Sequence, residues 1–294
     1  MKVPLLLLIL CIALAIPLFV SSVQHRQNIR QRAAETPALY WGVYVLGLTP
    51  FRDLSPITAF ENNAQKKVSL IMFYQKWFVT DGTQHFMPAL MNSVRAHGSI
   101  PVVTWEPWDY STSKTSHPKL LQRIINGEFD TYITKWALDS KAWGHPYFLR
   151  FAHEMNGDWY PWAEKINGNS PGQYVQAWKH VHDIFTKNGV TNGTWVWSPH
   201  IDIAGAGYTP LQKLYPGDAY VDWHAFDFYA DARCPYLSPS SLYQWKDALA
   251  LNSQKPILLM EFGVTPKGDE TAPGCISGTG DRADGLVVGA RGEG

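Results

Sequence analysis

From residue 39 onward, apolar segments alternate with amphipathic ones. The seven apolar segments that we interpret as strands are Leu39–Leu46, Val68–Phe78, Ile100–Trp105, Pro146–His153, Thr194–Pro199, Tyr220–Tyr229 and Pro256–Gly263. Helical segments lie between them, and Ser55-Pro56 and Ser170-Pro171 each place a capping residue before a first-turn proline. Apolar strands that alternate with helices predict a parallel sheet covered by helices.

The number of these units predicts an α/β fold, a (β/α)8 TIM-type barrel, with its site at the carboxyl ends of the strands. The last 30 residues, 265–294, depart from the pattern because they contain eight glycines and no Phe, Trp or Tyr. Their one apolar patch, Gly285–Gly289, is too short for a further strand–helix unit. We therefore expect the eighth unit to be missing or degenerate.

The N-terminal segment has the pattern of an export signal. Lys2 precedes an apolar run from Val3 to Val20, and Ser21 and Ser22 follow it. The resulting organisation is a signal peptide over 1–22, a polar linker over 23–38, a catalytic barrel over 39–264 and a glycine-rich tail over 265–294. The alternative to a secreted protein is an uncleaved membrane anchor, because the run is about 18 residues long.

Charge and aromatic content narrow the class of partner. Lys+Arg and Asp+Glu both number 25, so the net charge gives no reason to expect nucleic acid or an anionic membrane surface as partner. The 13 Trp, 14 Tyr and 13 Phe include rings grouped with polar residues at strand ends. Flat rings of this kind stack on the apolar faces of sugars, and a neutral polysaccharide fits both observations.

Two predicted strands lead into glutamates, Glu154 and Glu261, at positions that a barrel brings to one mouth. A strand-end glutamate taken alone is more often a cap or an ion-pair partner, but two at matching ends favour acid–base and nucleophilic chemistry on a glycosidic bond. By strict alternation Arg150 and Glu154 share the inward face of one strand, and Ile257, Leu259 and Glu261 share that of another. A buried Arg150 would hold a neighbouring carboxylate ionised.

No metal or cofactor is predicted. His153-Glu154 begins like a zinc-protease helix, but residue 157 is Gly where a second His is needed. His180 and His182 stand two apart on a predicted helix and so point to different faces.

The run from Arg150 to Trp162, with Trp195–Pro199 and Met260–Gly263, resembles glycoside hydrolase family 26 from Leu39 to Gly263. The resemblance implies Glu154 as acid/base and Glu261 as nucleophile of a retaining mechanism. The residues that it implies around the substrate are His153, Trp159, Tyr229, Trp105, Trp162 and Arg150. One departure is His200, where the family more often has Asn.

The resulting hypothesis is an exported, monomeric endo-β-glycosidase acting on β-1,4-mannan-type polysaccharide. A mixed-linkage β-glucanase or a β-1,3-xylanase of the same family remains an alternative. So does a non-catalytic carbohydrate-binding protein, if the incomplete barrel is inactive.

Two cysteines, Cys234 and Cys275, follow the sixth and seventh predicted strands, whose loops a barrel makes neighbours. We predict a disulfide between them in an oxidising compartment. Two free thiols are the alternative.

Overall fold

The computed structural model describes residues 40–44, 53–79, 82–108, 113–201, 209–231, 246–251, 254–265 and 285–287; the side chains of 79, 229–231, 262–265 and 285–287 are outside that description. All described residues lie in one compact unit, 39–291. The predicted signal peptide and linker, Cys234 and Cys275 lie outside the described residues. Among the residues that are described, no helix has the length and apolar character needed to cross a membrane.

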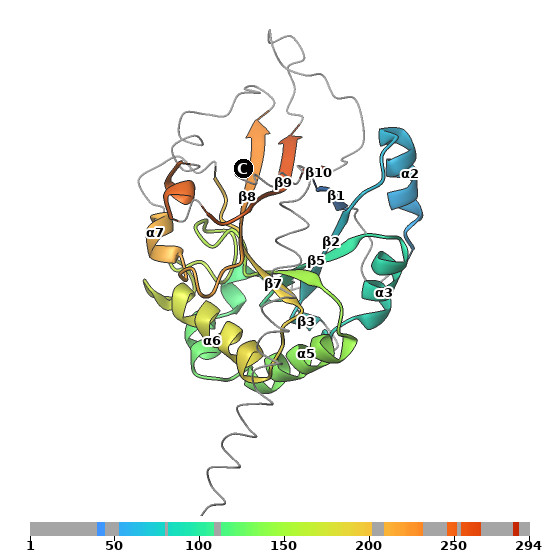
Figure 1. The fold of residues 1–294 in the computed structure, drawn as a ribbon. Helices are drawn as coiled ribbons and strands as arrows, with labels where there is room; N and C mark the ends of the chain where they lie inside the picture. The colour runs from blue at the N-terminus through green and yellow to red at the C-terminus, as the bar shows by residue number, and fades with distance from the viewer. Residues whose placement is uncertain are drawn as a thin grey trace, which may run out of the picture. The chain divides into compact units, whose positions relative to one another are not determined.

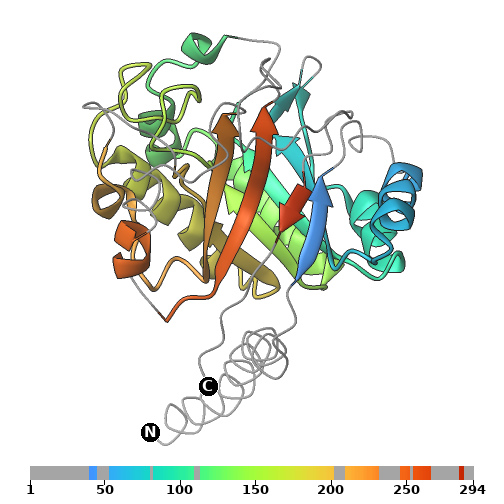
Figure 2. The same cartoon turned by 90° about the horizontal axis from the view of Figure 1, so that it is seen from above.

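The described strands form a closed barrel in the order β1-β10-β9-β8-β7-β6-β5-β2 (Figures 1 and 2). Their bounds are β1 Trp41–Tyr44, β2 Leu70–Lys76, β5 Ile100–Glu106, β6 Tyr147–Phe151, β7 Gly193–Trp197, β8 Trp223–Asp231, β9 Ile257–Thr265 and β10 Gly285–Val287. Each of the seven predicted strands is present, and these seven pair in parallel. The parallel sheet with helices is therefore confirmed.

The eighth position of the barrel differs from a regular strand–helix unit. β10 has three residues and runs antiparallel to both β1 and β9, lying between them in Figure 2. Residues 285–287 thus form a short antiparallel strand in place of the parallel strand of a regular eighth unit. Edge strands expose unpaired backbone groups, so even this short segment closes a gap that would otherwise leave two open edges.

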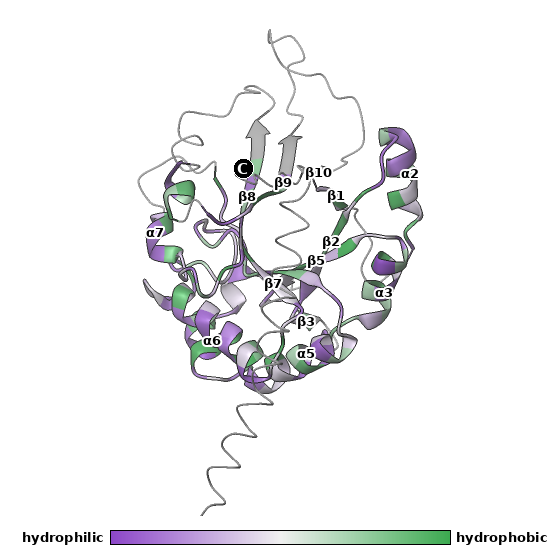
Figure 3. Ribbon diagram, viewed as in Figure 1, coloured by the Kyte–Doolittle hydropathy of each residue, from purple (hydrophilic) through white to green (hydrophobic). Residues whose placement is uncertain are grey.

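Helices surround the sheet (Figure 1), and their bounds are α2 Ser55–Ala64, α3 Pro88–Ala96, α4 Leu120–Ile125, α5 Asp130–Trp143, α6 Gln173–Lys187 and α7 Leu211–Leu214. Residues 246–251 are also helical, a 3-10 turn spans Lys114–Ser116, and β3 Phe78–Val79 pairs with β4 Gly82–Thr83. Apolar and polar residues occupy different faces of α5 and α6 (Figure 3), as expected for helices that cover a sheet.

Aromatic rings fill the layer between the strands and the helices. Trp105 of β5 lies 4.7 Å from Trp136 of α5 and 5.9 Å from Phe185 of α6, measured between ring centroids. All three are almost fully buried. Aromatic pairs of this kind each contribute about 0.5–1.5 kcal/mol beyond their buried area, so this layer stabilises the packing of the helices on the strands.

Strand β9 carries an irregularity that decides where Glu261 points. Phe226 of β8 pairs with Leu259, but its neighbour Asp227 pairs with Glu261, so Met260 is an extra residue on β9. Leu259 packs against the cluster shared with the helices. A regular strand would place Glu261 on that same outer face. The bulge instead brings Glu261 beside Asp227, on the inside of the barrel.

Candidate active site

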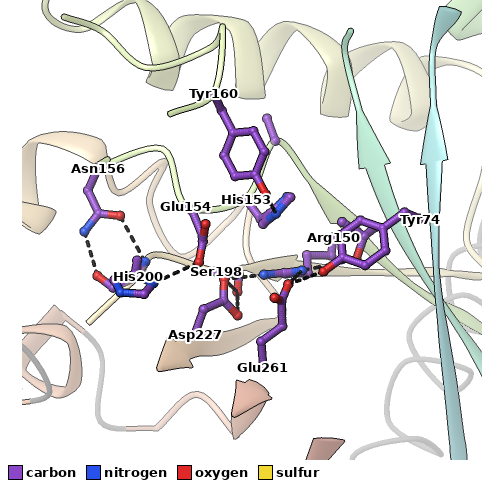
Figure 4. A network of polar contacts seen from close by, with 12 residues as sticks. Tyr74, Arg150, His153, Glu154, Asn156, Tyr160, Ser198, His200, Asp227 and Glu261 are labelled. Atoms are coloured by element: carbon purple, nitrogen blue, oxygen red, sulfur yellow. Dashed lines mark hydrogen bonds and ion pairs between the residues drawn. The ribbon is translucent and has the colours of Figure 1, made fainter. Parts of the chain in front are cut away.

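The centre of the site is the guanidinium of Arg150, which is fully buried on β6. It contacts the carboxylates of Asp227 and Glu261 (Figure 4), and its Nη1 also donates to Thr104 Oγ1 at 3.2 Å. Burial lowers the pKa of Arg150, but Asp227 and Glu261 outweigh burial and raise it above the ordinary value. The guanidinium therefore remains a fixed positive charge.

Glu261 accepts a second hydrogen bond from outside its own strand. Tyr74 on β2 donates its Oη proton to Glu261 Oε1 at 2.7 Å. Burial, and next the charge of Glu261, raise the pKa of Tyr74 well above 10, so the phenol keeps that proton. The Glu261 side chain is 10% exposed, enough to be reached from the barrel mouth. A cation and a phenol thus hold one carboxylate in its ionised form.

Asp227 completes the buried charge group. Its side chain is fully buried, and Ser198 Oγ lies 3.2 Å from each of its carboxylate oxygens. Burial raises the pKa of Asp227, and the contact with Arg150 opposes that rise. Asp227 and Glu261 share one guanidinium, so the positive charge of Arg150 is divided between two carboxylates.

The backbone that carries Glu154 is not a continuation of strand β6. The strand ends at Phe151, and Ala152 and Glu154 have φ values of 43° and 49°. The alternation argument that placed Glu154 on the inward face is therefore wrong, although its side chain does reach the site. The left-handed region costs a residue such as Glu about 1–2 kcal/mol. Backbone bonds from Ala152 N to Trp105 O (3.1 Å) and from Glu154 N to Ser198 O (2.7 Å) hold this conformation in place.

Both oxygens of the Glu154 carboxyl contact ring nitrogens. Trp159 Nε1 donates to Oε2 at 2.6 Å, and His200 Nδ1 lies 2.8 Å from Oε1. Trp159 reaches this position by lying across Gly157, where an added Cβ would stand 2.5 Å from the indole ring. Gly157 is therefore required for the close approach of Trp159 to Glu154, and this explains the glycine in the motif that follows the strand.

A stacked aromatic group stands beside the carboxylates. Tyr160 lies parallel to Trp162, with ring centroids 4.4 Å apart, and its Oη is 3.0 Å from His153 Nε2. Trp162 Nε1 donates to the His153 carbonyl at 2.7 Å. Burial first, then Arg150 and His200, lower the pKa of His153 well below its usual value, so this ring is neutral. Trp162 is fully buried, so its predicted stacking contact with a substrate is corrected to packing against Tyr160 and His153.

The structure brings together Glu154, Glu261, His153, Trp159 and Arg150 as predicted from the sequence. Trp105 does not join them: its neighbour Thr104 faces Arg150, while Trp105 is fully buried against the helices. Its predicted stacking contact with a substrate is therefore corrected to a role in the core. The backbone of Tyr229 pairs with Gly263 on β9, and its side chain lies outside the description.

Sequence reasoning missed Tyr74 and Tyr160. Tyr74 shares the parity of Leu70 and Met72 on β2, an inward face that alternation along the predicted strand could have identified. Tyr160 stands two residues before Trp162 in a motif already marked as functional. Within the described residues, no group of three or more His, Cys, Asp or Glu side chains could hold a metal ion.

A parallel sheet with helices that brings two glutamates, a buried arginine and aromatic rings to one end defines the class, a glycoside hydrolase. A model of glycosyl hydrolase family 26 matches residues 27–268, and the chain belongs to that family.

Similar proteins carry several activities in their names. Endoglucanase H from Acetivibrio thermocellus is 38% identical over 229 residues, which are 74% of this chain and 24% of that protein. The mannan endo-1,4-beta-mannosidase of Bacillus subtilis is 22% identical over 260 residues, 86% of this chain and 63% of that protein. The chain thus spans less than two thirds of the length of either relative.

Solved structures share the fold. The Bacillus subtilis mannanase BCman has a TM-score of 0.58 at 18% identity, with 79% of this chain and 73% of that chain covered. A β-mannanase from a symbiotic protist of the termite Reticulitermes speratus has a TM-score of 0.56 at 20% identity, with 79% and 76% covered.

Proposed function

We propose that the protein is a retaining endo-β-glycosidase. Glu261 attacks the anomeric carbon, and Glu154 gives a proton to the departing glycosidic oxygen. Glu154, then a carboxylate, takes a proton from the water that releases the sugar from Glu261. The observation that carries this proposal is that two glutamates at one centre have opposite surroundings: a cation and a phenol at Glu261, and two ring nitrogens at Glu154.

The electrostatics support this division of roles. A nucleophile must remain ionised, and Arg150 favours the charged form of Glu261 by direct contact. An acid/base must gain and lose a proton in each cycle, and none of the described contacts of Glu154 is with the cation. The charges of both glutamates nevertheless raise the pKa of Arg150, and this supports their placement around one centre.

The relatives bear on the choice of polymer. The 38% identity with a protein named endoglucanase H supports a β-glucan as substrate. The mannan-type polymer expected from the sequence stays a second candidate, since the B. subtilis mannosidase aligns with 86% of the chain. A β-1,3-xylan is a third, because a Vibrio protein named β-1,3-xylanase is 26% identical over 147 residues.

The deciding experiment is to incubate the full chain with mixed-linkage β-glucan, galactomannan and β-1,3-xylan and to measure reducing ends and viscosity. Glu261→Ala is the control. Release from one polymer with an early fall in viscosity, absent in the variant, supports internal cleavage by this site. Proton NMR of the first product then tests retention, for which the product keeps the β-configuration.

The rival from another class is a non-catalytic carbohydrate-binding protein. Equal binding of a polymer by the wild type and by Glu261→Ala, with no reducing ends from either, would establish the rival and overturn the proposal. The intact contacts of Glu261 with Arg150 and Tyr74 support catalysis, because binding alone does not need an ionised buried carboxylate.

We also propose that the chain is exported through residues 1–22, or anchored by them, and acts as a monomer. β10 then stands in place of the eighth unit of the (β/α)8 barrel. Mass spectrometry of the secreted protein tests cleavage after Ser22 and the Cys234–Cys275 disulfide together.

A further inference from the structure

His200 is held in a fixed position beside the mouth of the barrel. It follows Pro199 after the end of β7, and its backbone forms an isolated bridge with Asp227 of β8. The buried Asn156 side chain contacts both backbone groups of His200: Nδ2 donates to the carbonyl at 2.7 Å, and Oδ1 accepts from the amide at 3.0 Å. Figure 4 shows these two bonds side by side. The backbone of His200 is therefore located by the loop that carries Glu154.

The ring of His200 is located as well. Trp159 packs edge-on against it, with 5.4 Å between centroids and 82° between planes, and the His200 side chain is 13% exposed. Glu154 contacts this ring at Nδ1, and His153 interacts with His200 electrostatically. A loop, an indole and a carboxyl thus fix one imidazole nitrogen 2.8 Å from Glu154 Oε1.

The two ring contacts of Glu154 differ in what they can do. An indole Nε1–H only donates, so Trp159 uses Oε2 of Glu154 as an acceptor in either form of the carboxyl group. An imidazole nitrogen donates in one tautomer and accepts in the other. Of these two contacts, His200 is therefore the one that can either donate to its carboxyl oxygen or accept from it as Glu154 loses and regains a proton.

We propose that His200 is a positioning residue for the acid/base, holding Oε1 of Glu154 in both protonation states of the catalytic cycle. This inference rests on the proposed function, in which Glu154 is protonated before the first step and ionised before the second. His200 need not touch the substrate; it acts by keeping the carboxyl in one orientation while its proton comes and goes.

The test compares three variants of His200. His200→Asn places an amide the same number of bonds from the backbone as Nδ1, and an amide can donate or accept. His200→Gln carries the same amide one bond further out, and His200→Leu has neither donor nor acceptor. Circular dichroism checks the fold of each variant, and Asn against Gln remains a matched polar pair if Leu does not fold.

The readout separates steps that need an acid from those that do not. The probes are the polymer that the wild type cleaves and the 2,4-dinitrophenyl glycoside of its disaccharide, whose leaving group departs without protonation. For Leu and Gln we expect kcat/KM on the polymer to fall by about 10- to 100-fold. On the dinitrophenyl glycoside kcat/KM should stay within about three-fold, while kcat and KM fall together as the intermediate accumulates. Asn should restore most of the polymer activity.

Glu154→Ala is the reference variant: its loss of kcat/KM on the polymer should be larger than that of the His200 variants, with kcat/KM on the dinitrophenyl glycoside again largely retained. If Glu154→Ala does not show the pattern, the proposed function is wrong. If Glu154→Ala shows it but Leu and Gln lose kcat/KM equally on both probes, or lose none, the role of His200 is wrong while the function stands. Failure of Asn to do better than Gln would also overturn the proposal.

Discussion

The two glutamates reach one centre by different structural means. Glu261 lies within strand β9, on the inside of the barrel, and its neighbours Arg150 and Tyr74 come from other strands. Glu154 lies past the end of its strand in a left-handed conformation, and its neighbours Trp159 and His200 come from loops. The scaffold thus supplies a fixed charge to one carboxylate and a set of adjustable contacts to the other.

This difference matches what each role demands. A nucleophile works best in one protonation state, so a buried cation held by rigid strands suits it. A group that exchanges protons needs partners that tolerate both states, and these are easier to provide from side chains on loops. Breaking either set of partners should therefore give a distinct signature.

The largest effect should come from the glutamates themselves. We expect Glu261→Ala to lower kcat by about 10⁴-fold or more on every substrate, because no other group replaces the attacking oxygen. Glu154→Ala should match this on the polymer but spare kcat/KM on the dinitrophenyl glycoside. Steady-state kinetics on both probes decide the matter; equal losses for Glu154→Ala on both would contradict the assignment of roles.

Removing the cation should be the next largest change. Arg150→Leu leaves two buried carboxylates without their partner, which costs about 3–5 kcal/mol of stability. Activity should survive only at higher pH, because Glu261 then binds a proton more readily and must lose it before it can attack.

The control for this change is Arg150→Lys, which keeps the charge but not the planar fork. It should retain more stability than Leu in urea unfolding and shift the acidic limb of the pH–rate profile less. An unchanged acidic limb in Arg150→Leu would show that Arg150 does not hold Glu261 ionised.

Tyr74→Phe should have a smaller effect on the same carboxylate. It removes the Oη donor from Glu261. A hydrogen bond to a charged group contributes about 1.5–3 kcal/mol, so we expect a loss of roughly 10- to 100-fold in kcat. The loss should be equal on the polymer and on the dinitrophenyl glycoside, because the nucleophile acts in both; a loss confined to the polymer would count against this role.

The smallest expected effect concerns stability at residue 154. Asn tolerates the left-handed region better than Glu or Gln, so Glu154→Asn should be more stable than Glu154→Gln by about 0.5–1 kcal/mol. At residue 261, which lies in strand β9 and has no positive φ, the same pair of substitutions should show no such gain. Urea unfolding of the four variants measures this, and a lower stability for Asn at residue 154 would rule out backbone strain there.

The strands and the pair of glutamates could be predicted from the sequence, because long apolar segments and their polar ends are local features. The backbone conformation that directs each glutamate side chain into the site could not be predicted in this way. The bulge at Met260 depends on pairing with β8, and the left-handed turn at Ala152 depends on bonds to Trp105 and Ser198. Strict alternation placed both Leu259 and Glu261 on the inward face. It is wrong for Leu259, and Glu261 faces inward only because the bulge at Met260 shifts the alternation by one residue.

The aromatic residues show the same limit. Trp105 and Trp159 both stand near strand ends in the sequence, yet one is buried beneath the helices and the other contacts Glu154. The distinction comes from parity on β5 and from Gly157, whose missing side chain admits the indole. The number of aromatic residues does not show which rings are buried in the core and which line the site. The strand register and the close contact at Gly157 make that distinction.

The extra residue in β9 has a consequence for how this gene can change. Loss of the codon for Met260 would leave Leu259 opposite Phe226 and Glu261 opposite Asp227, so the ladder on both sides of the deletion keeps its partners. Glu261 would then directly follow Leu259, which faces outward, so alternation keeps the carboxylate on the inside of the barrel, and only the local twist of the bulge is lost. We expect such a deletion to fold, with an unchanged circular dichroism spectrum, and to keep turnover that depends on Glu261. A single in-frame deletion in the middle of a core strand would then preserve both the fold and the side of the strand that carries the nucleophile.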